Sequence, residues 1–355
     1  MENKIKVGIL GATGSVGQKF IELLKNHPWF EISELGASER SAGKKYIDAT
    51  NWIMKNQLQP EVANIVVKEC TPDYESKLIF SGLDSSVAEQ IETDFANAGY
   101  FVISNSRNHR FDKDVPLMIP EVNADHLKLI DSQPYKGGIV TNPNCSTIGM
   151  ILALKPLHDA FKIKKINVVT MQALSGGGYP GVPSMDIIDN VIPYIGGEEE
   201  KMETEPRKIL GKLGDGEIIF DNDIKISAQC NRVAVIDGHL ETVQVEFENK
   251  PTKEEIIKAW ENFKGVPQEL NLPFAPVKPV HYFSQNNLPQ PKLQRDIENG
   301  MAASVGRLRE DPLFHYKFIV LSHNTVRGAA GGTILNAELL KAQGYLDKIA
   351  WVKKA

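Results

Sequence analysis

The sequence predicts an α/β protein in which a mostly parallel sheet, with helices between its strands, is joined to an inserted α+β part. Three observations predict this fold. Short apolar runs alternate with helical patterns between Lys4 and Thr141, as in βαβ units. Longer strand-like runs with few helices between them lie from Ile166 to Ser322. The chain has 355 residues, which is enough for two domains.

The first part is expected to begin with a strand at Lys4–Leu10, which runs into a glycine-rich turn. Apolar residues at helical spacing then predict a helix over Ser15–Lys25, and Pro28 ends it. A second strand follows at Ile32–Ala37. The other expected elements are a helix at Val87–Ala98 and the strands Leu78–Leu83, Phe101–Ser104 and Ile139–Thr141.

The second part is expected to hold a largely antiparallel sheet. A proline-rich connector, Pro273–Pro291, interrupts it, and a Gly/Ala-rich helix over Gly328–Leu346 closes the chain. We therefore assign residues 1–146 and 325–355 to one domain and 147–324 to the other. The expected strands are Ile166–Leu174, Ile224–Val235, Leu240–Glu248, Met301–Leu308 and Tyr316–Ser322.

Composition excludes several classes of protein. The 45 acidic and 40 basic residues give a net charge of -5, which argues against a general nucleic-acid binder. The longest uncharged run, Ile166–Met185, is rich in Gly, Pro and Ser and does not suit a membrane span. The three cysteines are too few and too scattered for a disulfide framework or a zinc site, and the N-terminus does not resemble a signal peptide. We expect a soluble, cytoplasmic protein without a metal.

The first chemical motif is the glycine-rich turn Gly11-Ala12-Thr13-Gly14-Ser15-Val16-Gly17. It lies between the first strand and the first helix, where a Rossmann-like fold binds the pyrophosphate of a dinucleotide at a helix N-terminus. The second strand is followed by Ser38, Glu39, Arg40 and Ser41. Because hydroxyls and an arginine suit a 2′-phosphate, these residues favour NADP over NAD.

Cys145 stands in Asn142-Pro143-Asn144-Cys145-Ser146-Thr147, at the expected start of a helix. A helix N-terminus stabilises a thiolate, so we expect a lowered thiol pKa and a nucleophilic role. A buried structural cysteine is the alternative.

A nucleophilic thiol needs a partner for proton transfer, and two histidines are candidates. His239 follows an Asp-Gly turn, with Arg232 on the other side of that turn, and His323 precedes Asn324. Spacing does not decide between them. The run Ser175-Gly176-Gly177-Gly178 lets backbone approach a ligand closely. The charged run 198–208 is typical of a solvent-exposed helix face.

Together these motifs resemble the aspartate-β-semialdehyde dehydrogenases, in particular the archaeal and fungal branch. The resemblance covers Gly8 to about Asn336. Its further markers are SERSAGKK (38–45), DVPLMIPEVN (114–123), CNRVAVIDGH (230–239) and HNTVRGAAGG (323–332). It implies reductive dephosphorylation of aspartyl phosphate to aspartate semialdehyde through a cysteine thioester, in lysine, threonine and methionine biosynthesis. It implies a homodimer or homotetramer with no nucleic-acid or membrane partner.

The resemblance also implies a role for each site residue. Cys145 is the nucleophile, His239 the acid–base group and Gln172 the residue that orients the acyl intermediate. Arg232 holds the substrate carboxylate. Glu205 binds the substrate ammonium, with Glu203 as the alternative residue for this role. Phosphate is bound by Arg110, Asn144 and Lys208. NADP is expected to contact Gly11, Thr13, Gly14, Ser15, Val16, Ser38, Arg40, Ser41, Gly176, Gly177 and Asn324.

Three alternatives remain. N-acetyl-glutamyl-phosphate reductases share the glycine turn but typically carry NPGCY where this chain has NPNCS. Malonyl-CoA reductases resemble the whole chain but differ around the nucleophile. A dinucleotide sensor without activity would be expected to lack Cys145 or His239, and both are present.

Overall fold

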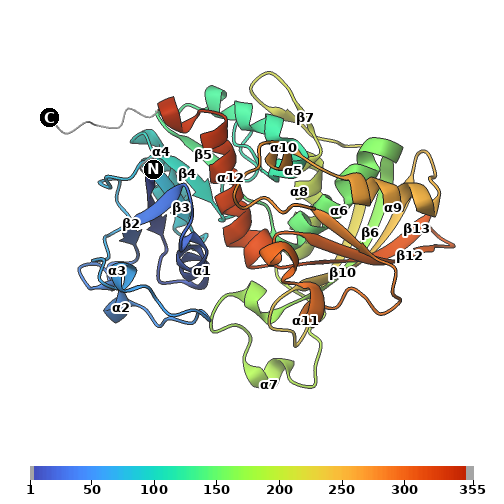
Figure 1. Ribbon diagram of the computed structural model, residues 1–355, viewed down its shortest axis with the longest axis horizontal. Helices are drawn as coiled ribbons and strands as arrows, with labels where there is room; N and C mark the ends of the chain where they lie inside the picture. Colours follow the sequence, from blue (N-terminus) through green and yellow to red (C-terminus); the bar gives the residue numbers. More distant parts are fainter. Residues whose placement is uncertain (1–3, 349–355) are drawn as a thin grey trace.

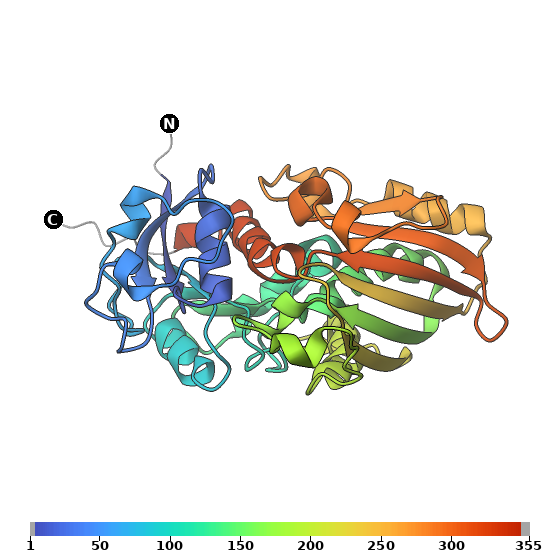
Figure 2. The ribbon, with the colours of Figure 1, turned by 90° about the horizontal axis from the view of Figure 1, so that it is seen from below.

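The computed structural model describes residues 4–348, which form two lobes on separate sheets (Figure 1 and Figure 2). The first lobe contains a sheet whose strands are all parallel, in the order β2-β1-β3-β4-β5. This confirms the mostly parallel sheet. The strands are β1 (Ile5–Leu10), β2 (Phe30–Gly36), β3 (Leu78–Ser81), β4 (Phe101–Ser104) and β5 (Gly138–Thr141).

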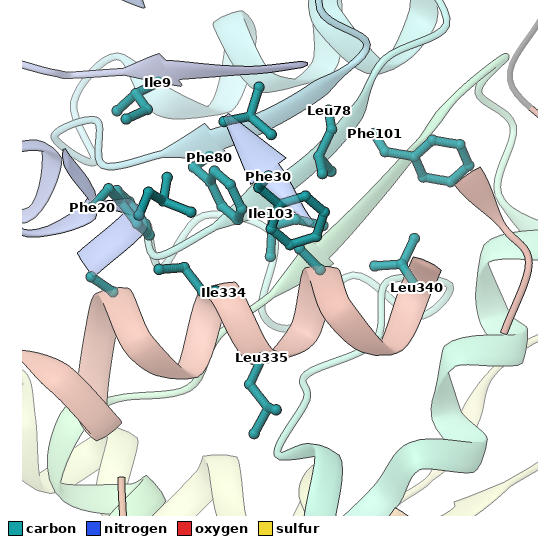
Figure 3. Close-up of a cluster of buried hydrophobic side chains, with 14 of the residues drawn as sticks. Ile9, Phe20, Phe30, Leu78, Phe80, Phe101, Ile103, Ile334, Leu335 and Leu340 are labelled. Carbon is teal, nitrogen blue, oxygen red and sulfur yellow. The ribbon is translucent and has the colours of Figure 1, made fainter. Parts of the chain in front are cut away.

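Helices cover both faces of this sheet. They are α1 (Ser15–Leu24), α2 (Tyr46–Ala49), α3 (Pro60–Ala63), α4 (Ala88–Asn97) and α5 (Pro120–Asn123). The chain returns to this lobe at its end, where α12 (Gly331–Ala342) contributes Ile334 to the same apolar core as Phe20, Phe30 and Phe80 (Figure 3). The expected closing helix is therefore present. A π-helical turn, Val326–Ala330, precedes it.

The second lobe contains a six-stranded sheet in the order β11-β12-β13-β10-β6-β9. The largely antiparallel pairing expected here is only part of the arrangement, because β6 pairs with β9, and β11 with β12, in parallel. A long connection joins the two strands of each parallel pair, which leaves room for the crossover that parallel pairing requires. The strands are β6 (Ile163–Gln172), β9 (Lys225–Arg232), β10 (His239–Phe247), β11 (Val280–Phe283), β12 (Ala303–Glu310) and β13 (Tyr316–Ser322).

One face of this sheet is covered by α6 (Cys145–Phe161), α8 (Glu198–Ile209) and α9 (Lys253–Asn262). Alternate residues of β10 point to that face, and Val243 and Val245 pack there with Trp260 of α9. The sequence pattern did not predict α9 or β11. The small elements of this lobe are α7 (Ser184–Ile187), α10 (Val266–Glu269), α11 (Pro291–Gln294), β7 (Lys212–Leu213) and β8 (Ile218–Ile219).

The two sheets meet at the ends that carry the polar motifs. β6 and β9 run parallel and end together, with Gln172 opposite Arg232. β10 runs the other way and begins at this edge with His239. Cys145 begins α6 directly after β5, the last strand of the first sheet. The fold thus gathers these four side chains between the lobes.

The domain boundaries proposed from the sequence stay predictions, and residues 349–355 of the first domain lie outside the described part. Within residues 4–348, every helix is too short or too polar to traverse a lipid bilayer.

Candidate active site

Cys145 and His239 form a direct pair. Cys145 is the first residue of α6, and the side chain of Asn144 caps the helix by accepting from the N–H groups of Ser146 and Thr147. The Sγ atom of Cys145 lies 3.2 Å from Nε2 of His239. His323 lies beside Asp296 instead, with 3.7 Å between its Nε2 and Oδ1 of the aspartate. The structure therefore places His239 at the sulfur.

A backbone group sets the tautomer of His239. The N–H of Ala173 donates to Nδ1 of the imidazole over 3.0 Å. Because Nδ1 accepts this hydrogen bond, the proton of the neutral ring lies on Nε2, which faces Cys145. His239 therefore presents a hydrogen-bond donor to the sulfur and to any oxygen bound beside it.

The sequence-based expectation of a lowered thiol pKa is wrong for this site. Burial raises the pKa of the Cys145 thiol to about 12, and the carboxylate of Glu198 acts in the same direction. Arg110, Arg232 and Lys201 oppose this rise without overcoming it. Burial also lowers the pKa of His239 to about 3. Desolvation is the largest cause of both shifts, and it favours the neutral forms of the thiol and the imidazole.

A carboxylate and an ammonium from one turn of α8 line the cavity beside Cys145. Glu198 accepts hydrogen bonds from Nδ2 of Asn144 (2.8 Å) and Nε2 of Gln172 (3.2 Å), and it pairs with Lys201 over 2.7 Å. Burial raises the pKa of Glu198, but Lys201 and these hydrogen bonds outweigh it and leave the pKa below its ordinary value. Glu198 is therefore anionic and suited to an ammonium.

Glu205 and Lys208, which the resemblance placed on the substrate, lie away from this cavity. Both are fully buried. One oxygen of Glu205 pairs with Arg110 (2.7 Å) and the other accepts the N–H of Asn144 (2.7 Å). Glu203 accepts the N–H of Ala228. These carboxylates hold the protein scaffold and do not fit the assigned ammonium site.

Lys208 has a structural environment. Its Nζ donates to the carbonyl oxygens of Arg110, Asp112 and Val115 at 2.7–2.8 Å, which accounts for all three ammonium hydrogens. It therefore fastens the loop that carries Arg110 and has no donor left for phosphate.

Two arginines act on the thiol of Cys145. Arg110 lines the cavity, and its Nη2 donates to the carbonyl of Asn105. Arg232 is buried, donates from Nη1 to the carbonyl of Ala173 over 2.7 Å, and opposes the rise in the pKa of Cys145. The structure thus provides two cationic groups that can each receive an anion.

The same cavity, of about 800 Å³, extends to the glycine turn of the first lobe, where Ser15 and Val16 line it. Gly11 has a positive φ of 70°, and a Cβ at Gly17 would meet the Gly11 oxygen at 2.3 Å, so this turn requires glycine. Gly14 precedes α1, whose N-terminus has no side-chain cap. Free N–H groups therefore point to a space that suits a pyrophosphate.

The other expected cofactor residues fall in two places. Ser38 and Arg40 are exposed in a turn after β2, next to the glycine turn after β1, and Ser41 is half-buried there. Asn324 lines the same cavity as Cys145. Its Nδ2 donates to Oγ of Ser175, and its Oδ1 accepts the N–H of Gly238.

Gly176 lies against the side chains of Arg232 and His239. A Cβ there would meet Nη1 of Arg232 at 2.8 Å and the ring of His239 at 3.0 Å, whereas a Cβ at Gly177 would meet nothing within 4 Å. We expect Gly176→Ala to displace both side chains and to lower kcat/KM by about tenfold or more, since small misplacements at a reacting centre are costly. Gly177→Ala adds the same methyl group without a clash, so kcat at saturating NADP+ should stay within about twofold, and any change at this expected cofactor contact should fall on the KM for NADP+. Equal rates for the two variants in a steady-state assay would contradict this packing.

Two family models divide the chain in the same way as the sheets do. The semialdehyde dehydrogenase NAD-binding domain matches residues 6–130, and the semialdehyde dehydrogenase dimerisation domain matches residues 154–327. The aspartate-semialdehyde dehydrogenase of Archaeoglobus fulgidus is 50% identical over 95% of this chain and 98% of its own. The chain belongs to the aspartate-semialdehyde dehydrogenase family.

Further members of the family agree with this assignment. The Saccharomyces cerevisiae enzyme is 45% identical over 98% of this chain and 100% of its own. A crystal structure of the Candida albicans aspartate-semialdehyde dehydrogenase with NADP matches with a TM-score of 0.90 and 45% identity, over 96% of this chain and 99% of that one. The Rossmann-like fold and the oxidoreductase class are therefore confirmed.

Proposed function

We propose that this protein is an NADP-dependent aspartate-semialdehyde dehydrogenase that reduces L-aspartyl-4-phosphate to L-aspartate 4-semialdehyde. One observation carries the proposal: a single cavity joins the N-terminus of α1, which suits a pyrophosphate, to the thiol of Cys145. The family relationships favour this reaction over malonyl-CoA reduction and N-acetyl-glutamyl-phosphate reduction. The intact Cys145–His239 pair argues against a sensor without activity.

The residues present fit NADP. A Cβ at Gly14 would meet only the Gly11 oxygen, at 3.4 Å, and the N-terminus of α1 has no side-chain cap, so its N–H groups can serve as donors. Arg40 and the hydroxyls of Ser38 and Ser41 suit the 2′-phosphate, and Asn324 suits the nicotinamide end beside Cys145. When bound, NADPH supplies the hydride that reduces the acyl group.

The first chemical step is acyl transfer. Sγ of Cys145 attacks the acyl carbon, a thioester forms, and the phosphate leaves with the thiol proton. The substrate carries a carboxylate and an ammonium, for which we propose Arg232 and Glu198. For the phosphoryl group we propose Arg110 and Lys201. Lys201 replaces Lys208, because the Nζ of Lys208 is fully used by carbonyls.

The second step is reduction of the thioester, and the charge that develops on the acyl oxygen needs a donor. Nε2–H of His239, 3.2 Å from the sulfur, is the group held in place to hydrogen-bond that oxygen, and then the sulfur as the C–S bond breaks and the aldehyde leaves. The proton that Sγ regains comes from solvent, which replaces the proton that left with the phosphate. Gln172 is fixed by Glu198 and orients the acyl group. The product feeds amino-acid biosynthesis, with lysine, threonine and methionine as the proposed end points.

The match of the second lobe to a dimerisation domain supports an oligomer. We propose a homodimer or a homotetramer assembled through this lobe, with small molecules as its only other ligands.

An initial-rate assay tests the function. Phosphate-dependent reduction of NADP+ by aspartate semialdehyde is the expected result, with malonyl-CoA and N-acetylglutamate semialdehyde turned over far more slowly in parallel reactions. Faster turnover of either alternative substrate would reject the proposal.

Two lysines on α8 provide a second test. Lys201→Met should raise the phosphate KM by about tenfold or more, because a charge-assisted hydrogen bond is lost, and should leave the melting temperature nearly unchanged. Lys208→Met should instead leave three buried carbonyls without a donor and cost about 3 kcal/mol or more of stability. Thermal unfolding and phosphate titrations of both variants distinguish the roles, and the reverse pattern would restore the assignment made from the sequence.

A further inference from the structure

Two buried donors beside Cys145 lack a partner within the described part of the chain. They are Nδ2 of Asn105, in the loop that follows β4, and Nε of Arg110, five residues later. Both residues line the cavity, and Nη2 of Arg110 donates to the carbonyl of Asn105 over 3.0 Å. Buried N–H groups without acceptors are costly, so two of them on neighbouring residues that line one cavity indicate a ligand with acceptor oxygens.

The amide of Asn105 is held in one orientation. Nδ2 of Asn142 donates to Oδ1 of Asn105 (3.2 Å) and also to the carbonyl of Gly328 (3.3 Å). The oxygen of the Asn105 amide is therefore used, and its NH₂ group is the free end. The backbone N–H of Asn105 donates to the carbonyl of Ser81 (3.1 Å), which fixes the start of the loop. Asn105 is a preorganised donor.

These donors lie close to the nucleophile. Gly328, which shares Asn142 with Asn105, packs so tightly on Cys145 that a Cβ there would meet Cys145 Cβ at 2.7 Å. Arg110 acts directly on the pKa of the thiol. In the acyl transfer described above, the phosphoryl group is bonded to the carbonyl that Sγ attacks, so it must lie within a few ångströms of the sulfur.

We propose that Asn105 is a ligand of the phosphoryl group, donating from Nδ2 beside Nε of Arg110. The proposal rests on the proposed function and adds a residue that no sequence motif indicated. A phosphoryl group offers several acceptor oxygens and can satisfy both donors together. The substrate carboxylate is assigned to Arg232, which donates to the carbonyl of Ala173.

Kinetics of Asn105→Ala and Asn105→Asp test this role. Asn105→Ala should raise the phosphate KM about tenfold to a hundredfold and leave the KM values for NADP+ and the semialdehyde within about twofold. Asn105→Asp should raise it further, because a carboxylate would repel the phosphate. Ser106→Ala is the matched control: it also lines the cavity, but its hydroxyl already donates to Asn108 (2.6 Å), so the phosphate KM should stay within about twofold.

A second readout does not need turnover. Inorganic phosphate should protect Cys145 of the wild-type protein from alkylation by iodoacetamide. In Asn105→Ala, the phosphate concentration that gives half-protection should be at least about tenfold higher than in the wild type. An unchanged phosphate KM, or a change that falls on NADP+ instead, overturns the proposal. A wild-type protein without phosphate-dependent activity would reject the proposed function itself. An active wild type with unaffected Asn105 variants would reject only the role of Asn105.

Discussion

Cys145→Ser should lose at least about 10³-fold in kcat while it still folds and binds NADP. A hydroxyl is much less acidic than a thiol and a much weaker nucleophile towards an acyl phosphate. The environment of residue 145 increases the loss, because burial already raises the pKa of the thiol and would disfavour an alkoxide more strongly. Stopped-flow and steady-state measurements of NADP+ reduction give the size of the effect.

The matched control is Cys70→Ser. Cys70 is half-buried next to the backbone of Ala37, and its Sγ lies 3.6 Å from the carbonyl oxygen there. Its loss should leave kcat within about twofold. Mass spectrometry of the wild-type protein mixed with aspartyl phosphate should detect an acyl group on Cys145. Near-normal turnover in Cys145→Ala would end the thioester mechanism.

The second large effect is expected on stability, at the buried pair Arg327–Glu121. Both side chains are almost completely buried, and the guanidinium binds the carboxylate through two bonds, Nη1–Oε1 at 2.8 Å and Nη2–Oε2 at 2.6 Å. Arg327→Met would leave the charge of Glu121 buried and unpaired. We expect a loss of about 3–5 kcal/mol in the free energy of unfolding, measured by urea denaturation.

Two further variants make this prediction specific. The double variant Arg327→Met/Glu121→Leu removes both charges and should be less destabilised than Arg327→Met alone. Lys155→Met breaks an i,i+4 pair with Asp159, whose side chain is 53% exposed, and should change stability by no more than about 0.5 kcal/mol. If the double variant loses as much stability as the sum of its single variants, the two residues are not coupled.

Local features of this chain could be predicted from the sequence, whereas contacts between distant residues such as Glu121 and Arg327 could not. The glycine turn and the strand and helix around it were predicted because their signals are local: glycines at fixed spacing, an apolar run before them and a helical pattern after them. The start of α6 at Cys145 was predicted for the same reason, since a strand end, Pro143 and a helical pattern follow one another there, and the structure adds that Asn144 caps this helix. Glu121 and Arg327 stand in two motifs that the sequence marked, 114–123 and 323–332, but nothing local says that they meet.

Tertiary structure decided which charged residues of α8 face the site. Glu198/Lys201 and Glu205/Lys208 have the same spacing and lie seven residues apart, which is about two helical turns, so both pairs share one face of the helix. Only the docking of α8 shows that the first pair lines the cavity and the second is buried beneath the loop of Arg110.

The sequence by itself determined the family, the βαβ lobe and the glycine turn, and it predicted Cys145 as the nucleophile, because each of these rests on residues that are close together in the chain. The protonation of Cys145, the tautomer of His239 and the free donor of Asn105 were decided by the tertiary structure. The pKa of Cys145 depends first on burial and then on Glu198, the tautomer of His239 on Ala173, and the free donor of Asn105 on Asn142. Desolvation and hydrogen-bond geometry are set by the packing of such segments, and no local pattern in the chain records it.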